Sequence, residues 1–103
     1  MYDFKQFYIN GQWVDPVTPR DYGVVNPATE SVVGTISMGS PADVDKAVAA
    51  AKSAFETFGR TSRQERIELL EAILAEYQKR KEDIALTISD EMGAPMALAR
   101  GAQ

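Results

Sequence analysis

The apolar residues of the chain change their period once, at Ser40 and Pro41, and this change divides the sequence into two kinds of structure. Before Ser40, short runs of β-branched and aromatic residues are separated by turn residues, which is typical of β-strands. After Pro41, apolar residues recur every three or four positions, as on one face of an α-helix. We therefore predict an α+β arrangement, with two hairpins over about residues 6–37 and amphipathic helices over about 41–58 and 63–92, then the start of a helix from 95.

The first hairpin is predicted by Asn10-Gly11, because this dipeptide accepts the positive φ angles of a two-residue type I′ turn. The register of such a turn places Tyr8 opposite Trp13. Both faces of the ribbon then carry apolar groups, and an isolated hairpin is only marginally stable in water. We therefore expect other structure to cover it.

A second hairpin is predicted from residues 23–25 and 31–36, with a turn between them. Asn26 precedes Pro27, which favours an extended backbone and marks the end of the first strand. The side chains of Asn26 and Thr29 suit an Asx turn and local capping, and we prefer this interpretation to a ligand-binding role.

The helices have explicit boundary signals. Ser40 is suited to the N-cap of the first helix, with Pro41 and Asp43 in its first turn. Ser62 and Glu65 have the spacing of a capping box and indicate a second start. Two glycines, Gly59 and Gly93, are expected to end these helices. Cations at 79–81 followed by anions at 82–83 suit a kink or break in the second helix, but no glycine or proline enforces it and one long helix reaching residue 92 remains open.

The composition excludes most independent chemistry. The 103 residues contain no cysteine and no histidine, which removes disulfides, thiol nucleophiles and imidazole bases. The glycines do not form a G-x-G-x-x-G or P-loop spacing, so no catalytic and no cofactor-binding residue is predicted. A net charge of −4 disfavours nucleic acid as a partner. The sequence also has neither a membrane-length apolar run nor a signal peptide, and we expect a cytoplasmic protein.

Five motifs stand in a recognisable order. They are FYINGQWV at 7–14, VNPAT at 25–29, ADVDKAVAAAKSAF at 42–55, ER at 65–66 and EMGAP at 91–95. This order resembles the N-terminal region of the NAD(P)-dependent aldehyde dehydrogenase superfamily, and the resemblance covers nearly the whole chain. Ala94 stands where the family usually has lysine.

The resemblance implies a parent enzyme that oxidises an aldehyde to a carboxylic acid with NAD or NADP, through a cysteine thiohemiacetal and thioester. It implies that this segment is the N-terminal part of the dinucleotide-binding domain of a Rossmann-like fold, acting as scaffold for the remainder of its own chain in a homodimer or tetramer. The alternative is a self-contained α+β module that binds a protein partner and has no enzymatic activity.

The resemblance also implies one possible site. In some members a monovalent cation is bound by backbone carbonyls before the Asn-Pro turn and by a carboxylate of the closing motif. The matching positions are Val24, Val25 and Glu91. The competing interpretation is that Glu91 is an exposed carboxylate near a helix C-terminus, where the helix dipole disfavours it unless a cation compensates.

Overall fold

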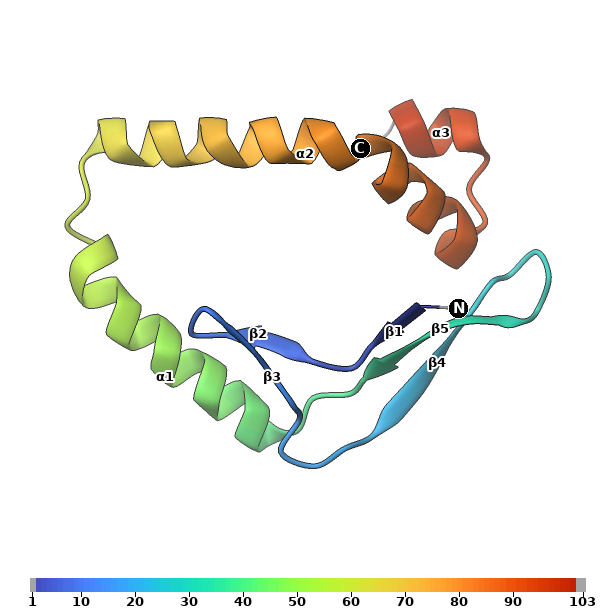
Figure 1. Cartoon of the computed structure of the whole chain (residues 1–103), viewed down its shortest axis with the longest axis horizontal. Coiled ribbons are helices and arrows are strands. Elements are labelled where there is room, and N and C mark those ends of the chain that lie inside the picture. The colour runs from blue at the N-terminus through green and yellow to red at the C-terminus, as the bar shows by residue number, and fades with distance from the viewer. Residues whose placement is uncertain (1, 102–103) are drawn as a thin grey trace. The chain divides into compact units, whose positions relative to one another are not determined.

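A computed structural model describes residues 2–101, and in this range five strands precede three helices (Figure 1). The chain divides into two compact units. The first comprises the chain up to Val25 together with Val32–Arg60, and the second comprises Asn26–Ser31 together with the chain from Thr61. The predicted α+β order of strands followed by helices is confirmed.

The first predicted hairpin is confirmed in the first unit. β2 (Phe7–Ile9) pairs antiparallel with β3 (Gln12–Val14), and Tyr8 lies opposite Trp13. The turn residues Asn10 and Gly11 have φ angles of 53° and 76°, as a type I′ turn requires. The rings of Tyr8 and Trp13 are 5.2 Å apart and tilted by 59°, a favourable aromatic geometry.

The second hairpin is also confirmed, and it belongs to a larger sheet than we predicted. β4 (Asp21–Val25) pairs antiparallel with β5 (Val32–Ser37), and β1 (Tyr2–Phe4) pairs parallel with the other edge of β5. The prediction that strands begin at about residue 6 missed β1, because a parallel pair joins segments far apart in sequence and leaves no local turn signal. Gly34 permits this pairing, since a Cβ there would lie 3.3 Å from the Tyr2 carbonyl oxygen.

α1 (Pro41–Phe58) begins with the predicted cap, in which Ser40 and Asp43 form a reciprocal capping box. Gly59 follows the helix as predicted, but its φ of −61° is right-handed rather than left-handed. Glycine is needed there for space, because a Cβ would lie 2.8 Å from the Phe55 carbonyl oxygen. Gly59 therefore ends α1 through a close backbone approach and not through a left-handed cap.

α2 (Arg63–Met92) is one continuous helix that starts at the predicted Ser62–Glu65 box, so it has no break and the prediction of one long helix is confirmed. Figure 1 shows that it changes direction towards its C-terminal end. The Thr87 hydroxyl donates to the Asp83 carbonyl at 3.0 Å, a contact that often bends helices. Gly93 ends α2 with a φ of 75°, the left-handed conformation that favours glycine.

The buried apolar core of the described residues lies in the second unit, where α2 meets α3 (Met96–Gly101). It consists of Ala85, Ala94 and Ala99, with Ile88 and Met96 packed against them. Alanine side chains let the two helices approach closely, but they bury little apolar area. The described residues thus have a small buried core, and many of their large apolar side chains are exposed to solvent.

Candidate functional site

The candidate site is the pair of apolar helix faces that the chain leaves in contact with solvent. On α1, Val44 is 58% and Phe55 is 70% exposed, and on α2, Leu70 is 65% and Ile73 is 56% exposed. Side chains of this size are usually buried in a folded protein, and contiguous exposed apolar patches mark interaction surfaces. We call these surfaces the α1 face and the α2 face, and each is defined by its two named residues and their neighbours one helical turn away.

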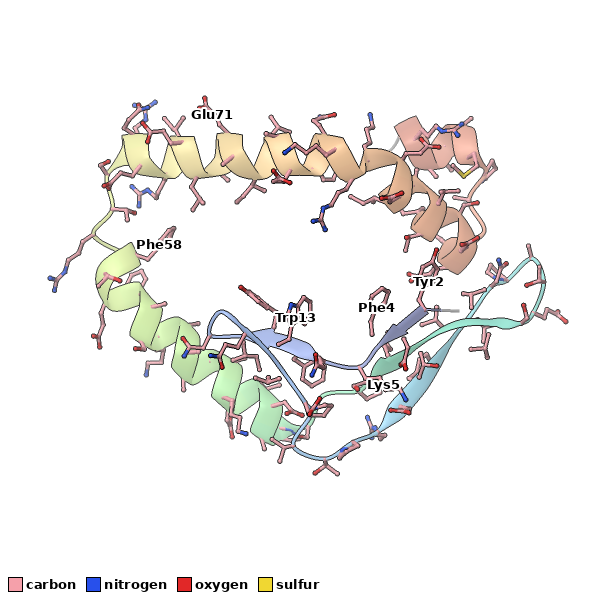
Figure 2. The ribbon with its side chains drawn as sticks, in the orientation of Figure 1. Tyr2, Phe4, Lys5, Trp13, Phe58 and Glu71 are labelled. Carbon is pink, nitrogen blue, oxygen red and sulfur yellow. The ribbon has the colours of Figure 1, made fainter. Side chains whose placement is uncertain are left out.

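The first unit holds a groove of about 330 Å³ between the hairpin turn and α1. Its floor on the helix is formed by small side chains, which leave room for the hairpin to approach. The lining residues are Tyr8, Ile9, Asn10, Gly11, Ala47, Ala50, Ala51 and Ala54. Trp13, on the outer strand of the hairpin, is 67% exposed and adds a large aromatic surface to this unit (Figure 2).

Asp43 is the buried acidic side chain of the first unit, at 5% exposure. Its Oδ2 accepts hydrogen bonds from the Ser40 backbone N–H at 2.8 Å and the Ser40 hydroxyl at 2.9 Å. Its Oδ1 accepts from the Val17 backbone N–H at 2.9 Å. The hydrogen bonds from the Ser40 and Val17 backbone lower the pKa of the Asp43 carboxyl below its ordinary value of 3.8.

The Asn26–Ser31 turn belongs to the second unit and packs against the end of α2. The Asn26 side chain accepts from the Ala28 N–H at 2.8 Å, which confirms the predicted Asx turn. Pro27 lies so close to Gly93 that a Cβ on this glycine would be 2.9 Å from the Pro27 Cγ. The glycine therefore serves both the left-handed cap and this contact.

An ion pair joins α2 to α3. The Arg100 guanidinium donates from Nη2 to Glu82 Oε1 at 2.6 Å and from Nε to both carboxylate oxygens at 3.1 Å. This contact lowers the pKa of the Glu82 carboxyl below its ordinary value. Both side chains are more than half exposed, so the pair orients α3 more than it stabilises the fold.

The residues predicted for a monovalent cation occupy two different units. Val24 and Val25 end β4, where the pairing with β5 shifts register and skips Val33. Glu91 lies exposed in the last turn of α2. A cation site at these three positions stays a prediction.

The described part of the chain brings no three acidic, cysteine or histidine side chains together in a group able to hold a metal. No helix within residues 2–101 is long and apolar enough to cross a membrane.

Sequence reasoning missed two of the contacts described above. Asp43 was predicted as a cap residue, but its bond to Val17, 26 residues away, had no local signal. The Glu82–Arg100 pair spans 18 residues and a turn, beyond the spacing of helical side-chain pairs. These partners become visible only in the folded chain, where residues 26 and 18 positions apart come into contact.

Comparison with known proteins identifies the family. Residues 13–103 match the aldehyde dehydrogenase family. The chain is 48% identical over 96 residues to 3-succinoylsemialdehyde-pyridine dehydrogenase of a Pseudomonas species, covering 93% of this chain and 20% of that protein.

Solved structures agree with this match. An aldehyde dehydrogenase of Bartonella henselae is 51% identical with a TM-score of 0.97, covering 99% of this chain and 21% of its own. Aldehyde dehydrogenase C of Pseudomonas syringae, solved as a mutant with NAD+ and octanal, is 46% identical with a TM-score of 0.91, covering 94% of this chain and 20% of its own. The chain thus spans about a fifth of the length of the relatives it matches. It belongs to the aldehyde dehydrogenase family and corresponds to an N-terminal segment of that family.

Proposed function

We propose that this chain is the N-terminal scaffold of an NAD(P)-dependent aldehyde dehydrogenase that oxidises an aldehyde to a carboxylic acid. The observation that carries the proposal is the match of nearly the whole chain to about a fifth of several aldehyde dehydrogenases. Relatives solved with NAD+, and in one case with octanal, support this cofactor and substrate class. The family match argues against the alternative of a self-contained interaction module without activity.

In this proposal the reaction uses residues outside the present sequence. A cysteine thiolate of the parent enzyme would add to the aldehyde carbonyl, bound NAD(P)+ would supply the hydride acceptor, and water would release the carboxylic acid from the thioester. The chain has no cysteine to supply the thiolate. Its own contribution is to form the N-terminal part of the dinucleotide-binding domain and to pack its apolar faces on the rest of the enzyme.

The exposed faces supply the energetic basis for this role. Burying a leucine or isoleucine side chain that is otherwise exposed contributes about 1.5–3 kcal/mol. Leu70 and Ile73 are more than half exposed in this chain, so most of that free energy is still available for docking. The proposal extends to a cytoplasmic homodimer or homotetramer, which light scattering of the purified enzyme and cell fractionation would check.

The test uses the enzyme that carries this segment. Leu70→Asp places a charge on the α2 face, and Ala75→Asp places the same charge on an exposed position outside that face. We expect Leu70→Asp to abolish soluble, active enzyme, and Ala75→Asp to retain NADH formation from an aldehyde. Equal activity of the two variants would contradict docking of the α2 face. Failure of the unmodified enzyme to reduce NAD+ or NADP+ with any aldehyde would contradict the dehydrogenase function.

A further inference from the structure

The segment 15–20 connects β3 to β4 and has neither helical nor strand structure, and we call it the strap. It contains Pro16 and Pro19, which restrict its backbone but cannot donate hydrogen bonds. Three contacts hold it. The Gln6 side chain donates to the Asp15 carboxylate, the Val17 N–H donates to Asp43, and the Met38 N–H donates to the Arg20 carbonyl.

Among these three contacts, the one at Val17 reaches the helix. Gln6 precedes β2 and Met38 follows β5, whereas Asp43 lies in the first turn of α1. The Val17–Asp43 bond is also the one made by a buried acceptor, and hydrogen bonds between a backbone N–H and an ionised carboxylate are about twice as strong as neutral ones. This bond therefore links the strap directly to the first turn of α1 and restrains the position of α1 relative to the hairpin.

The two oxygens of Asp43 have separate tasks. Oδ2 closes the capping box with Ser40, while Oδ1 receives the strap. Each hydrogen bond needs one acceptor oxygen, and a carboxylate has two, one for the Ser40 N–H and one for the Val17 N–H. An asparagine at this position presents one carbonyl oxygen and one NH2 donor, so one of the two N–H groups would face a donor.

We propose that Asp43 is a positioning residue that fixes the strap to α1 through the oxygen its helix cap leaves free, and thereby sets the groove between the hairpin and α1. Val17 supplies the backbone donor and no side-chain chemistry. The groove depends on this connection because its two walls, the Tyr8–Gly11 turn and the alanines of α1, belong to separate elements. The inference rests on the geometry of the first unit and does not require the dehydrogenase proposal.

The chain offers a matched control in its second helix. Ser62 and Glu65 form the same kind of box, with the Glu65 carboxylate accepting from the Ser62 N–H at 2.6 Å, but Glu65 is exposed, whereas Asp43 is buried. Glu65→Ala therefore removes a cap alone. Ser40→Ala weakens the α1 cap and leaves Oδ1 of Asp43 free to hold Val17.

The experiment measures amide hydrogen exchange in the full-length enzyme. In Asp43→Ala we expect exchange at the Val17 amide to rise roughly tenfold or more, because local opening controls this rate. Ser40→Ala and Glu65→Ala should leave the Val17 rate unchanged. An unchanged rate in Asp43→Ala, or an equal rise in Ser40→Ala, would overturn the proposal.

A second measurement covers the case in which Asp43→Ala does not fold. Val17→Pro removes the donor and leaves the capping box intact. We expect the shifts in denaturation midpoint of Val17→Pro and Asp43→Asn to be less than additive in the double variant, because asparagine has one acceptor for two N–H groups and removing the Val17 donor leaves that acceptor for Ser40. Additive shifts would show that Asp43 acts through its cap alone. Aldehyde oxidation is not the readout, so failure here leaves the dehydrogenase proposal standing.

Discussion

Gly93 allows the sharpest prediction, because two independent features oppose any side chain there. Its φ of 75° lies in the left-handed region, where a residue with a Cβ is disfavoured by roughly 1–2 kcal/mol. A Cβ would also lie 2.9 Å from Pro27 Cγ, well inside an ordinary carbon–carbon contact of about 3.5–4.0 Å. Forcing an extra carbon into a packed contact costs about 1–3 kcal/mol. Gly93→Ala should therefore lower the free energy of unfolding by about 2–5 kcal/mol.

Gly11 is the matched control for the conformational part of this cost. Its φ is 76°, nearly the same angle, but nothing lies within 4 Å of a Cβ built there. Gly11→Ala should therefore cost only about 1–2 kcal/mol. Urea denaturation of the full-length enzyme would measure both variants, with the midpoint and slope compared to the unsubstituted protein.

A double-variant cycle isolates the contact itself. Pro27→Ala removes the Cγ and keeps the Cβ, which is 3.9 Å from the new methyl group and makes an ordinary contact. In this background Gly93→Ala should be less destabilising by about 1–3 kcal/mol. If Gly93→Ala costs no more than Gly11→Ala, and Pro27→Ala changes nothing, the packing of the Asn-Pro turn on the α2 end is refuted.

Two further outcomes follow from charged groups. Arg100→Gln should speed amide exchange at Ala99 several-fold without unfolding α2, because the pair with Glu82 holds α3 in place; unchanged exchange would contradict this. The hydrogen bond from the Ser62 N–H lowers the pKa of the Glu65 carboxyl below its ordinary value of 4.5. The stability contributed by this cap is therefore complete above pH 4.5 and is lost as the pH falls through the lower pKa of Glu65 in the folded state. Glu65→Gln should flatten this part of the stability–pH curve, and an identical curve would refute the capping role.

Local signals were sufficient for the elements that neighbouring residues decide. The Asn10-Gly11 turn with its Tyr8–Trp13 pairing follows from turn geometry, and the start of α2 follows from the Ser62–Glu65 box. Each of these depends on backbone angles and hydrogen bonds within a few residues. A single sequence contains all the information that such contacts need.

The remaining features depend on segments that are distant in sequence. β1 exists because it pairs with β5 more than 30 residues away, and no signal within a few residues of β1 reveals that partner.

Motif order was enough to place this chain in its family, since it depends only on which residues are present and in what sequence. Which oxygen of Asp43 holds the strap, and which carboxylate Arg100 pairs with, emerged from the folded chain alone. A hydrogen bond between distant residues requires the donor and acceptor atoms to come within about 3.2 Å, and that condition is set by the path of the whole chain rather than by local preference.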